Sequence, residues 1–474
     1  MYDVKKFRIL LPEITFDFCY FKTQFGDYVL YQPSTQSMYA VEDDFINYVE
    51  ENNTIDLSVA APTNMEEKIA KYFNEICDDV KKRMNESFED SKKPDNYFRQ
   101  VVINVSHDCN LRCKYCYASQ GSYGRDIALL SKHVASQILE FFKGKNLSSI
   151  LFFGGEPLLN TDMITYLAEG FIAQQKTTPN FSVITNGTIV NDHIINILKK
   201  YDMQITVSID GPKNIHDKMR PFEDGCGSYD LVKSNISKLR KHIKDTNISI
   251  ETVYTKHHLQ AGYNMKQLRK YIINDLDLNG KNMVLCHSCM GEDMSMSFEL
   301  KEELKNVNEL FNSFYEDILL EKSPVMDWEW VDSLFRLGKK QVYDALCPLG
   351  EGVICITPDG DIYPCHNLAM INELKIGNVF NNNLDETIQK AKEKVSIAYK
   401  ENSPQCQECW FVDECKGCPA KIYLVEKNIN KIPDWFCKTR IDFFKQKAGW
   451  IVKLVKENNF ELFKENLSKV GQPL

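Results

Sequence analysis

The sequence lacks the features of a membrane, exported or nucleic-acid-binding protein. No apolar run reaches the roughly 18 residues that a membrane-spanning helix needs. The N-terminus, MYDVKKFRILLPEITFDF, has neither a long apolar core nor a small-residue cleavage site. Basic charge is not in excess, because 57 Lys and Arg stand against 66 Asp and Glu. We therefore expect a cytoplasmic protein with no membrane and no nucleic-acid partner.

Cysteine, in contrast, is abundant, with 16 residues in a chain of 474. Cytosolic thiols stay reduced, so clustered cysteines point to metal or redox chemistry rather than to disulfides. Three of them lie within 109–116 and eight within 347–437. The remaining five are Cys19, Cys77, Cys226, Cys286 and Cys289.

Periodicity divides the chain into five parts. Residues 1–95 read as a small α+β module, with a hairpin over 28–32 and 37–41 followed by two helices, over 42–51 and 64–87. Residues 96–292 alternate strand-like and helix-like runs, which predicts a parallel sheet with right-handed crossovers. Six βα units predict an α/β fold with an open, partial (β/α)6 barrel. The six strands are expected at 100–105, 149–153, 181–185, 204–209, 248–254 and 283–287.

The remaining segments follow the barrel. Residues 293–345 predict a helical bridge, and 346–440 are turn-rich and hold eight cysteines. The last part, 441–474, predicts a C-terminal helix, because apolar residues recur at helical spacing from about 439 to 468.

The first cysteine region reads Cys109-Asn-Leu-Arg-Cys113-Lys-Tyr-Cys116, directly after the first predicted barrel strand. Iron–sulfur clusters are held by cysteine thiolates, usually four for each cubane. With three cysteines and no fourth nearby, one iron would be free to bind a small molecule. A structural zinc site is the alternative, although it would want four ligands, usually as two pairs.

This CxxxCxxC motif at the start of a βα barrel resembles the radical S-adenosylmethionine (SAM) superfamily. The resemblance implies a 4Fe–4S cluster on Cys109, Cys113 and Cys116 whose open iron binds the amino and carboxylate groups of SAM. Reductive cleavage of SAM would then yield a 5′-deoxyadenosyl radical that abstracts a hydrogen atom. Tyr115, just before the third cysteine, would lie against the adenine.

Residues at the ends of the following strands fit the same resemblance, since functional residues of βα barrels gather at the C-terminal strand ends. Phe153-Gly154-Gly155-Glu156-Pro157 resembles the family's GGEP motif, in which Glu156 would accept a hydrogen bond from the SAM amino group. The other candidates for binding SAM are Asn186, Ser208, Asp210 and Arg220. Each has a structural alternative, because Gly-Gly often forms a turn and Ser-x-Asp can cap a helix.

The second cysteine region resembles the SPASM extension of radical SAM peptide-modifying enzymes, in the pattern from Gly360-x4-Cys365 to Cys437. Its last short spacing, Cys415-x2-Cys418, departs from the more usual three residues. Eight cysteines suit two cubanes. By resemblance, auxiliary cluster I takes Cys347, Cys355, Cys365 and Cys418. Auxiliary cluster II takes Cys406, Cys409, Cys415 and Cys437.

Two alternatives stay open for this region. Cys355 lies closer to Gly360 than the corresponding ligand usually does. Without Cys355, cluster I would keep an open iron for a substrate thiolate. The whole region could instead hold two structural zinc ions.

The N-terminal module resembles the winged-helix-like leader-recognition element of peptide maturases, which binds an extended leader as an added strand. The expected partners are a precursor peptide and a reducing electron donor, flavodoxin or ferredoxin.

The cofactors implied by these resemblances are SAM and three 4Fe–4S clusters, one that binds SAM and two auxiliary. The combined pattern predicts a radical SAM oxidoreductase that modifies a ribosomally made peptide and forms a cysteine thioether crosslink. An auxiliary cluster would bind the substrate or accept the electron left after bond formation. The alternatives are a quinohemoprotein amine dehydrogenase maturase, an anaerobic sulfatase (formylglycine) maturase and a non-catalytic iron–sulfur or zinc protein. No catalytic base is assigned.

Overall fold

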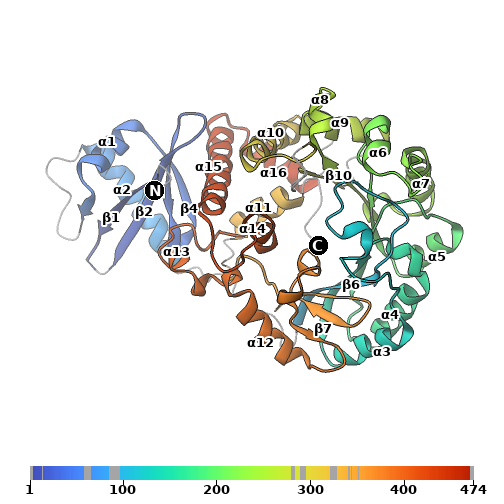
Figure 1. Cartoon of the computed structure of the whole chain (residues 1–474). Helices are drawn as coiled ribbons and strands as arrows, with labels where there is room; N and C mark the ends of the chain where they lie inside the picture. Colours follow the sequence, from blue (N-terminus) through green and yellow to red (C-terminus); the bar gives the residue numbers. More distant parts are fainter. Residues whose placement is uncertain are drawn as a thin grey trace.

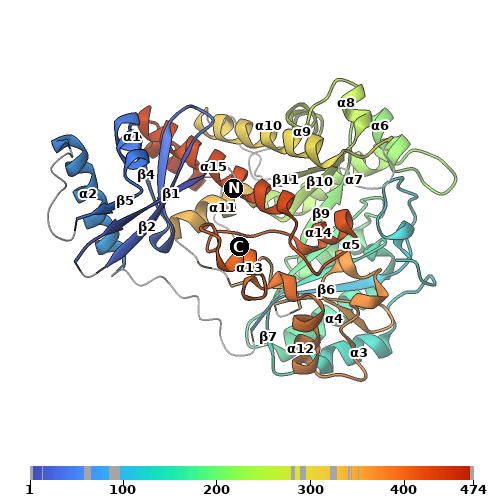
Figure 2. The same cartoon turned by 60° about the vertical axis from the view of Figure 1, so that its left-hand side comes forward.

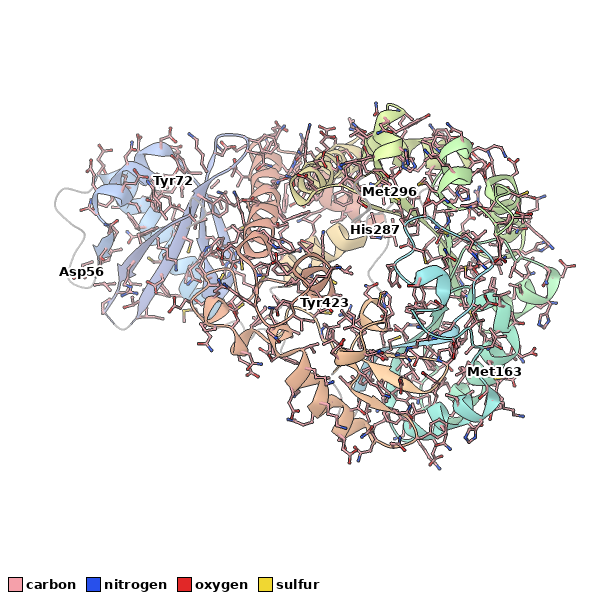
Figure 3. The ribbon with its side chains drawn as sticks, viewed as in Figure 1. Asp56, Tyr72, Met163, His287, Met296 and Tyr423 are labelled. Carbon is pink, nitrogen blue, oxygen red and sulfur yellow. The ribbon has the colours of Figure 1, made fainter. Side chains whose placement is uncertain are left out.

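The computed structural model of the chain separates an N-terminal unit from a larger barrel, with the C-terminal segments between and beneath them (Figure 1). Tyr72 and Met163 mark these two ends of the molecule (Figure 3). The predicted boundaries near 95 and 292, and Cys289, lie outside the described part of the chain. The structure describes residues 4–12, 14–57, 66–84, 97–278, 283–288, 295–320, 328–339, 342, 344–350 and 352–469.

The N-terminal unit is a five-stranded sheet in the order β4-β3-β2-β1-β5. The predicted hairpin is confirmed as β3 (Tyr28–Gln32) and β4 (Ser37–Val41), and both helices are present as α1 (Asp43–Glu51) and α2 (Glu67–Met84). The remaining strands were not predicted. They are β1 (Lys5–Leu10), β2 (Thr15–Lys22) and β5 (Thr54–Asp56).

Both faces of this sheet are packed, which explains why β2 escaped prediction. Its residues 18–21 are all buried, so the strand does not show the alternation of a half-exposed strand. One face packs on α1 and α2 through Phe7, Phe18 and Phe73. The other face packs, through Phe21 and Tyr31, on C-terminal residues described below.

The predicted partial barrel is confirmed. Six strands pair in parallel in chain order, with register pairs such as Val101↔Ile150 and Val183↔Ile205. The strands are β6 (Tyr97–Ser106), β7 (Asn146–Gly154), β8 (Asn180–Thr185), β9 (Gln204–Ser208), β10 (Ile248–Tyr254) and β11 (Met283–Ser288).

Amphipathic helices cover the outside of the barrel, as the βα alternation requires. Side-chain caps begin three of them: Ser131, Asn191 and Asn264 each accept a hydrogen bond from a backbone N–H of the first turn. The helices are α3 (Lys132–Phe141), α4 (Thr161–Gln174), α5 (Asp192–Lys200), α6 (Lys213–Met219), α7 (Tyr229–His242), α8 (Lys256–Gln260) and α9 (Met265–Asp275).

The cysteine-rich region extends the barrel sheet instead of forming a detached domain. Strand β12 (Val353–Ile356) pairs in parallel with β6, and β13 (Asp361–Tyr363) and β14 (Gly377–Asn378) continue the sheet in antiparallel fashion. The whole sheet therefore has nine strands, ordered β11-β10-β9-β8-β7-β6-β12-β13-β14.

Helices form most of the remaining C-terminal structure. The predicted bridge contains α10 (Leu300–Leu319) and α11 (Trp328–Lys339). The cysteine-rich region adds α12 (Leu384–Lys394), α13 (Pro404–Gln407) and α14 (Pro419–Glu426). No helix in the described ranges is long and apolar enough to cross a lipid bilayer.

The C-terminal helix is divided in two, as α15 (Asp434–Lys456) and α16 (Phe460–Lys469). The chain bends at Asn458, whose φ of 56° lies in the left-handed region that ends helices. Helix α15 packs beside β3 of the N-terminal sheet, and both views show it there (Figures 1 and 2).

Candidate active site

The loop that carries the first three cysteines follows β6 and is held by backbone contacts to the segment after β9. Arg112 N donates to Pro221 O at 2.8 Å, and Lys114 N donates to Met219 O at 2.9 Å. The Arg112 guanidinium closes the loop on itself by donating to Cys109 O at 2.6 Å. The loop is therefore shaped by protein contacts that leave the thiols available.

The three thiols are brought together, as predicted. Burial raises the pKa of Cys109 to about 12, and Glu156, Cys113 and Cys116 add to this shift. Burial also raises the pKa of Cys113, which the nearby Arg220 guanidinium opposes. Thiols in this setting remain protonated near neutral pH unless a cation stabilises the thiolate.

Two glycines let the end of β7 approach the cysteine loop. A Cβ on Gly154, whose φ is +131°, would meet Ser106 O at 2.1 Å, and one on Gly155 would meet Asp108 O at 2.2 Å. Without side chains, the backbone instead forms hydrogen bonds there, with Glu156 N donating to Asp108 O at 2.8 Å. The predicted Gly-Gly-Glu turn therefore seats Glu156 next to the cysteines.

The Glu156 carboxylate is fully buried and hydrogen-bonded. It accepts from Thr185 Oγ1 at 2.7 Å, from Asn186 N at 2.8 Å and from Leu158 N at 3.0 Å. Burial raises its pKa, whereas these three donors lower it. Because the donors hold both oxygens, the orientation of the carboxylate is set before any ligand binds.

Asn186 connects the end of β8 to the cysteine loop. Its Nδ2 donates to Asn110 Oδ1 at 2.8 Å and lies 3.7 Å from Cys109 Sγ. Its Oδ1 accepts from Thr188 N and Thr188 Oγ1 at 2.9 and 2.7 Å. The side chain therefore orients the loop, a role that spacing alone did not reveal.

Tyr115, Asp210 and Arg220 form one buried network. The Tyr115 hydroxyl donates to Asp210 Oδ2 and accepts from Arg220 Nη1 at 2.8 Å. Asp210 Oδ1 also accepts from Val253 N at 3.0 Å. Ser208, at the end of β9, is buried two residues before Asp210. Met296 of the bridge packs on Tyr115 and Val253 in an apolar cluster, and it lies on the barrel near His287 (Figure 3).

Arg220 brings a buried hydrogen-bond donor to this network. Arg220 is 7% exposed, and its Nε has no hydrogen-bond partner among the described residues. A buried guanidinium donor without a partner is costly, so a ligand carboxylate would relieve it. The residues present therefore fit an amino acid ligand of the kind that SAM provides.

Two histidines behind Asp210 were missed in the sequence. His216 Nδ1 accepts from Asp210 N at 3.0 Å, and His258 Nε2 lies 2.9 Å from Asp210 O. Burial lowers the pKa of His216 to about 4, so this imidazole is neutral. His216 precedes Arg220 by one helical turn, a spacing that could have identified the pair.

Cys347, Cys365 and Cys418 form a second group of thiols. Burial raises the pKa of Cys347 to about 12, and Cys418 is the charged neighbour that raises it most. Burial also raises the pKa of Cys365, and the charges of Cys418 and then Cys347 raise it further. These three thiols therefore lie near one another, and their assignment to auxiliary cluster I stays a prediction.

Cys355 lies inside the barrel wall, and Cys365 is the neighbouring thiol that raises its pKa further after burial. It is fully buried on β12, where its register partner on β6 is Val102, and it packs with Tyr123 and Leu151. Its Sγ lies 3.7 Å from Asn104 Oδ1, to which it donates. The thiol therefore has its own polar partner within an apolar wall.

The third group joins Cys406, Cys409, Cys415 and Cys437. Burial raises the pKa of Cys437 to about 12, and the other three thiols raise it further. The loop turns tightly, with Cys409 N donating to Cys406 O at 3.1 Å and Cys415 N donating to Phe411 O at 3.1 Å. These four thiols therefore lie near one another, and their assignment to auxiliary cluster II stays a prediction.

No three Cys, His, Asp or Glu side chains converge closely enough to hold a single metal ion, within the ranges that the structure describes.

Comparisons with known proteins agree with this geometry. Residues 103–272 match the Radical SAM superfamily model, and residues 347–410 match the SPASM model, an iron–sulfur cluster-binding domain. The chain is therefore a radical SAM enzyme with a SPASM domain, a class that uses SAM and 4Fe–4S clusters.

Individual relatives are distant. The cysteine-type anaerobic sulfatase-maturating enzyme of Clostridium perfringens is 23% identical over 367 residues, which are 73% of this chain and 94% of that enzyme. The structure of native anSMEcpe with bound AdoMet and Kp18Cys peptide is similar with a TM-score of 0.62 and 21% identity, over 76% of this chain and 99% of that one. Streptococcus suis SuiB bound to precursor peptide SuiA has a TM-score of 0.51 and 15% identity, over 92% of this chain and 99% of that one.

Replacing Glu156 with Gln removes the buried charge while keeping the size of the side chain. We expect the Kd for SAM to rise about ten- to a hundredfold, which corresponds to the roughly 1.5–3 kcal/mol of a charged hydrogen bond. Equilibrium dialysis on the iron-reconstituted protein measures this change. Asp162→Asn, at an exposed carboxylate of α4, is the matched control, and an unchanged Kd in Glu156→Gln would refute the assignment.

Proposed function

We propose that this enzyme modifies a ribosomally made precursor peptide and joins a cysteine sulfur to a carbon of the same peptide. The observation that carries the proposal is the N-terminal sheet with its outer strand β4, which within the described residues pairs with β3 alone. Such an edge can accept an extended leader as an added strand.

The extent of the structural similarity supports this reading. The match to peptide-bound SuiB spans 92% of the chain, whereas the match to peptide-bound anSMEcpe spans 76%. A leader-binding unit in front of the barrel is expected for a peptide maturase and not for a sulfatase maturase. The residues assigned to it are 1–95.

The SAM site would be formed by the strand ends of the barrel. We propose that Cys109, Cys113 and Cys116 hold three irons of a 4Fe–4S cluster. Glu156, placed by Gly154 and Gly155, would receive the SAM amino group, and Arg220 would receive its carboxylate. The side chains expected around the adenosyl group are Tyr115, Asn186, Ser208 and Asp210.

Two further 4Fe–4S clusters would complete the enzyme. Cys406, Cys409, Cys415 and Cys437 supply four ligands for auxiliary cluster II. For auxiliary cluster I we propose three ligands, Cys347, Cys365 and Cys418, because Cys355 is directed toward Asn104 inside the barrel. One iron of cluster I would then be free for the thiolate of the substrate cysteine.

Thioether formation removes two hydrogens from the peptide, one as a hydrogen atom from carbon and one as a proton and an electron. When bound, SAM and its cluster supply the radical that takes the hydrogen atom, and the auxiliary clusters supply an electron acceptor. The protein's own part is to hold the reacting carbon near the SAM site and to exclude water. A flavodoxin or ferredoxin is proposed as the reducing partner.

A second candidate function is sulfatase maturation, in which a serine or cysteine is oxidised to formylglycine. It is favoured by the sequence similarity to the Clostridium perfringens enzyme over 73% of the chain. The cysteine groups described above serve either reaction. The two candidate functions are therefore distinguished by which substrate the enzyme converts.

The anaerobically reconstituted enzyme should convert a leader-bearing, cysteine-containing peptide to a product that lacks two hydrogens and resists thiol alkylation. Mass spectrometry and 5′-deoxyadenosine formation measure this reaction. Cys113→Ala should abolish SAM cleavage because an iron ligand is lost. An aldehyde on a sulfatase-derived peptide, with no change in the leader-bearing peptide, would establish the second candidate instead.

Leader binding can be tested at the two edges of the N-terminal sheet. Ala40 is exposed on β4, and proline there removes an N–H and fixes φ. We expect Ala40→Pro to weaken leader binding about tenfold, the roughly 1.4 kcal/mol of one hydrogen bond. Fluorescence anisotropy of a labelled leader measures the change. Thr54→Pro on the opposite edge strand β5 is the control, and a loss confined to that variant would contradict the assignment to β4.

The proposed open iron of cluster I predicts that Cys355 is dispensable for iron binding. Cys355→Ala should retain about twelve irons per chain, the content of three cubanes. Cys365→Ala is the matched comparison, and it should lose up to about four irons because it removes a ligand. Iron and sulfide assays measure both variants. Equal losses in the two variants would make Cys355 a fourth ligand.

A further inference from the structure

Lys400 is a buried lysine placed between the two auxiliary thiol groups. Lys400 is only 4% exposed. Its backbone N donates to Asp344 O at 3.0 Å, three residues before Cys347. Its Nζ donates to Val412 O at 2.5 Å, within the turn between Cys409 and Cys415.

The Lys400 ammonium acts mainly on one of the two auxiliary thiol groups, the group that contains Cys415. Burial lowers the pKa of Lys400, and Cys415 is the neighbouring group that opposes this most strongly, followed by Asp413 and Cys406. Burial raises the pKa of Cys415 to about 11, although the charges of Arg440 and Lys400 oppose this shift. Neither Cys347 nor Cys365 shows Lys400 among its main influences.

A buried ammonium is costly unless negative charge compensates it. Asp413 and Asp344 offer part of that charge, and the thiolates of a bound cluster would add more. Reduction gives an iron–sulfur cluster one further negative charge. Nearby positive charge therefore favours the reduced form and raises the reduction potential.

We propose that Lys400 is a positioning residue that sets the reduction potential of auxiliary cluster II. Its Nζ donates to Val412 O, which also accepts from Cys415 N at 3.2 Å, so the positive charge lies at the Cys409–Cys415 turn. This inference rests on the proposed assignment of four cysteines to cluster II. It implies that cluster II is tuned toward accepting an electron, independently of cluster I.

The test is a redox titration of the full-length, reconstituted enzyme, followed by electron paramagnetic resonance. The signal that changes on SAM addition belongs to the SAM-binding cluster, and the remaining signals belong to the auxiliary clusters. In Lys400→Met, one auxiliary midpoint should become more negative, with about a tenfold lower reduced-to-oxidised ratio at fixed potential, or about 59 mV. The other auxiliary midpoint should not move.

Three further variants separate charge from structure. Lys400→Arg keeps the charge, so its auxiliary midpoint potential should equal that of the wild type. Lys400→Gln keeps a donor for Val412 O without the charge, and should shift the midpoint as Lys400→Met does. Lys394→Met is the matched control, because Lys394 also donates to a backbone carbonyl, Glu373 O at 2.6 Å, but is exposed.

An unchanged midpoint in both neutral variants, or the same shift in Lys394→Met, would overturn the proposal. Loss of about four irons in both Lys400→Met and Lys400→Gln would also overturn it, because the residue would then be structural. Failure of the cluster assignment looks different: the wild-type enzyme itself would bind about eight irons or fewer. With about twelve irons in the wild type, the midpoints test Lys400 alone.

Discussion

The parallel pairing of β12 with β6 decides where the two cysteine regions lie. β6 leads directly into the loop of Cys109, and β12 turns back through the antiparallel β13 toward Cys365, so one continuous sheet connects the two cysteine regions. Arg125 strengthens this connection, because its Nη1 lies 2.7 Å from Asp359 Oδ2 and its Nη2 donates to the Tyr363 hydroxyl.

Within the barrel, the buried carboxylates of Glu156 and Asp210 are hydrogen-bonded by protein groups before any ligand arrives. Glu156 is held by donors from the ends of β7 and β8, and Asp210 by donors from β10 and the cysteine loop. Such networks are rigid because each unmade bond in a low-dielectric interior is expensive. The Nε of Arg220, beside Asp210, has no hydrogen-bond partner within the described residues, which makes it an informative group in this network.

The N-terminal unit is joined to the rest of the molecule by a shared core. Phe21 and Tyr31 of its sheet pack with Trp410 and Phe444, and the ring centroids of Tyr31 and Phe444 are 4.9 Å apart. Trp410 directly follows Cys409, so the N-terminal sheet and the group of Cys406, Cys409, Cys415 and Cys437 are neighbours. Removing residues 1–95 would expose this apolar surface, which makes point variants at the sheet edge the cleaner test.

Much of the fold could be read from the sequence because it depends on local patterns. The six barrel strands, the hairpin of the N-terminal unit and the bridge helices follow from periodicity, and the spacing of Cys109, Cys113 and Cys116 follows from one short loop. Strand β2 and the division of the C-terminal helix at Asn458 were not predicted. Burial on both faces hides alternation in β2, and one left-handed residue leaves the apolar spacing on either side unchanged.

The sequence by itself determined which residue types are available for cluster and SAM chemistry, since ligand spacing within a loop is a local property. Only the tertiary structure decided which distant residues meet. It placed His216 and His258 behind Asp210, Asn104 beside Cys355 and Lys400 beside Cys415. These contacts join segments from different strands and loops, so they depend on strand register and burial and not on any short motif.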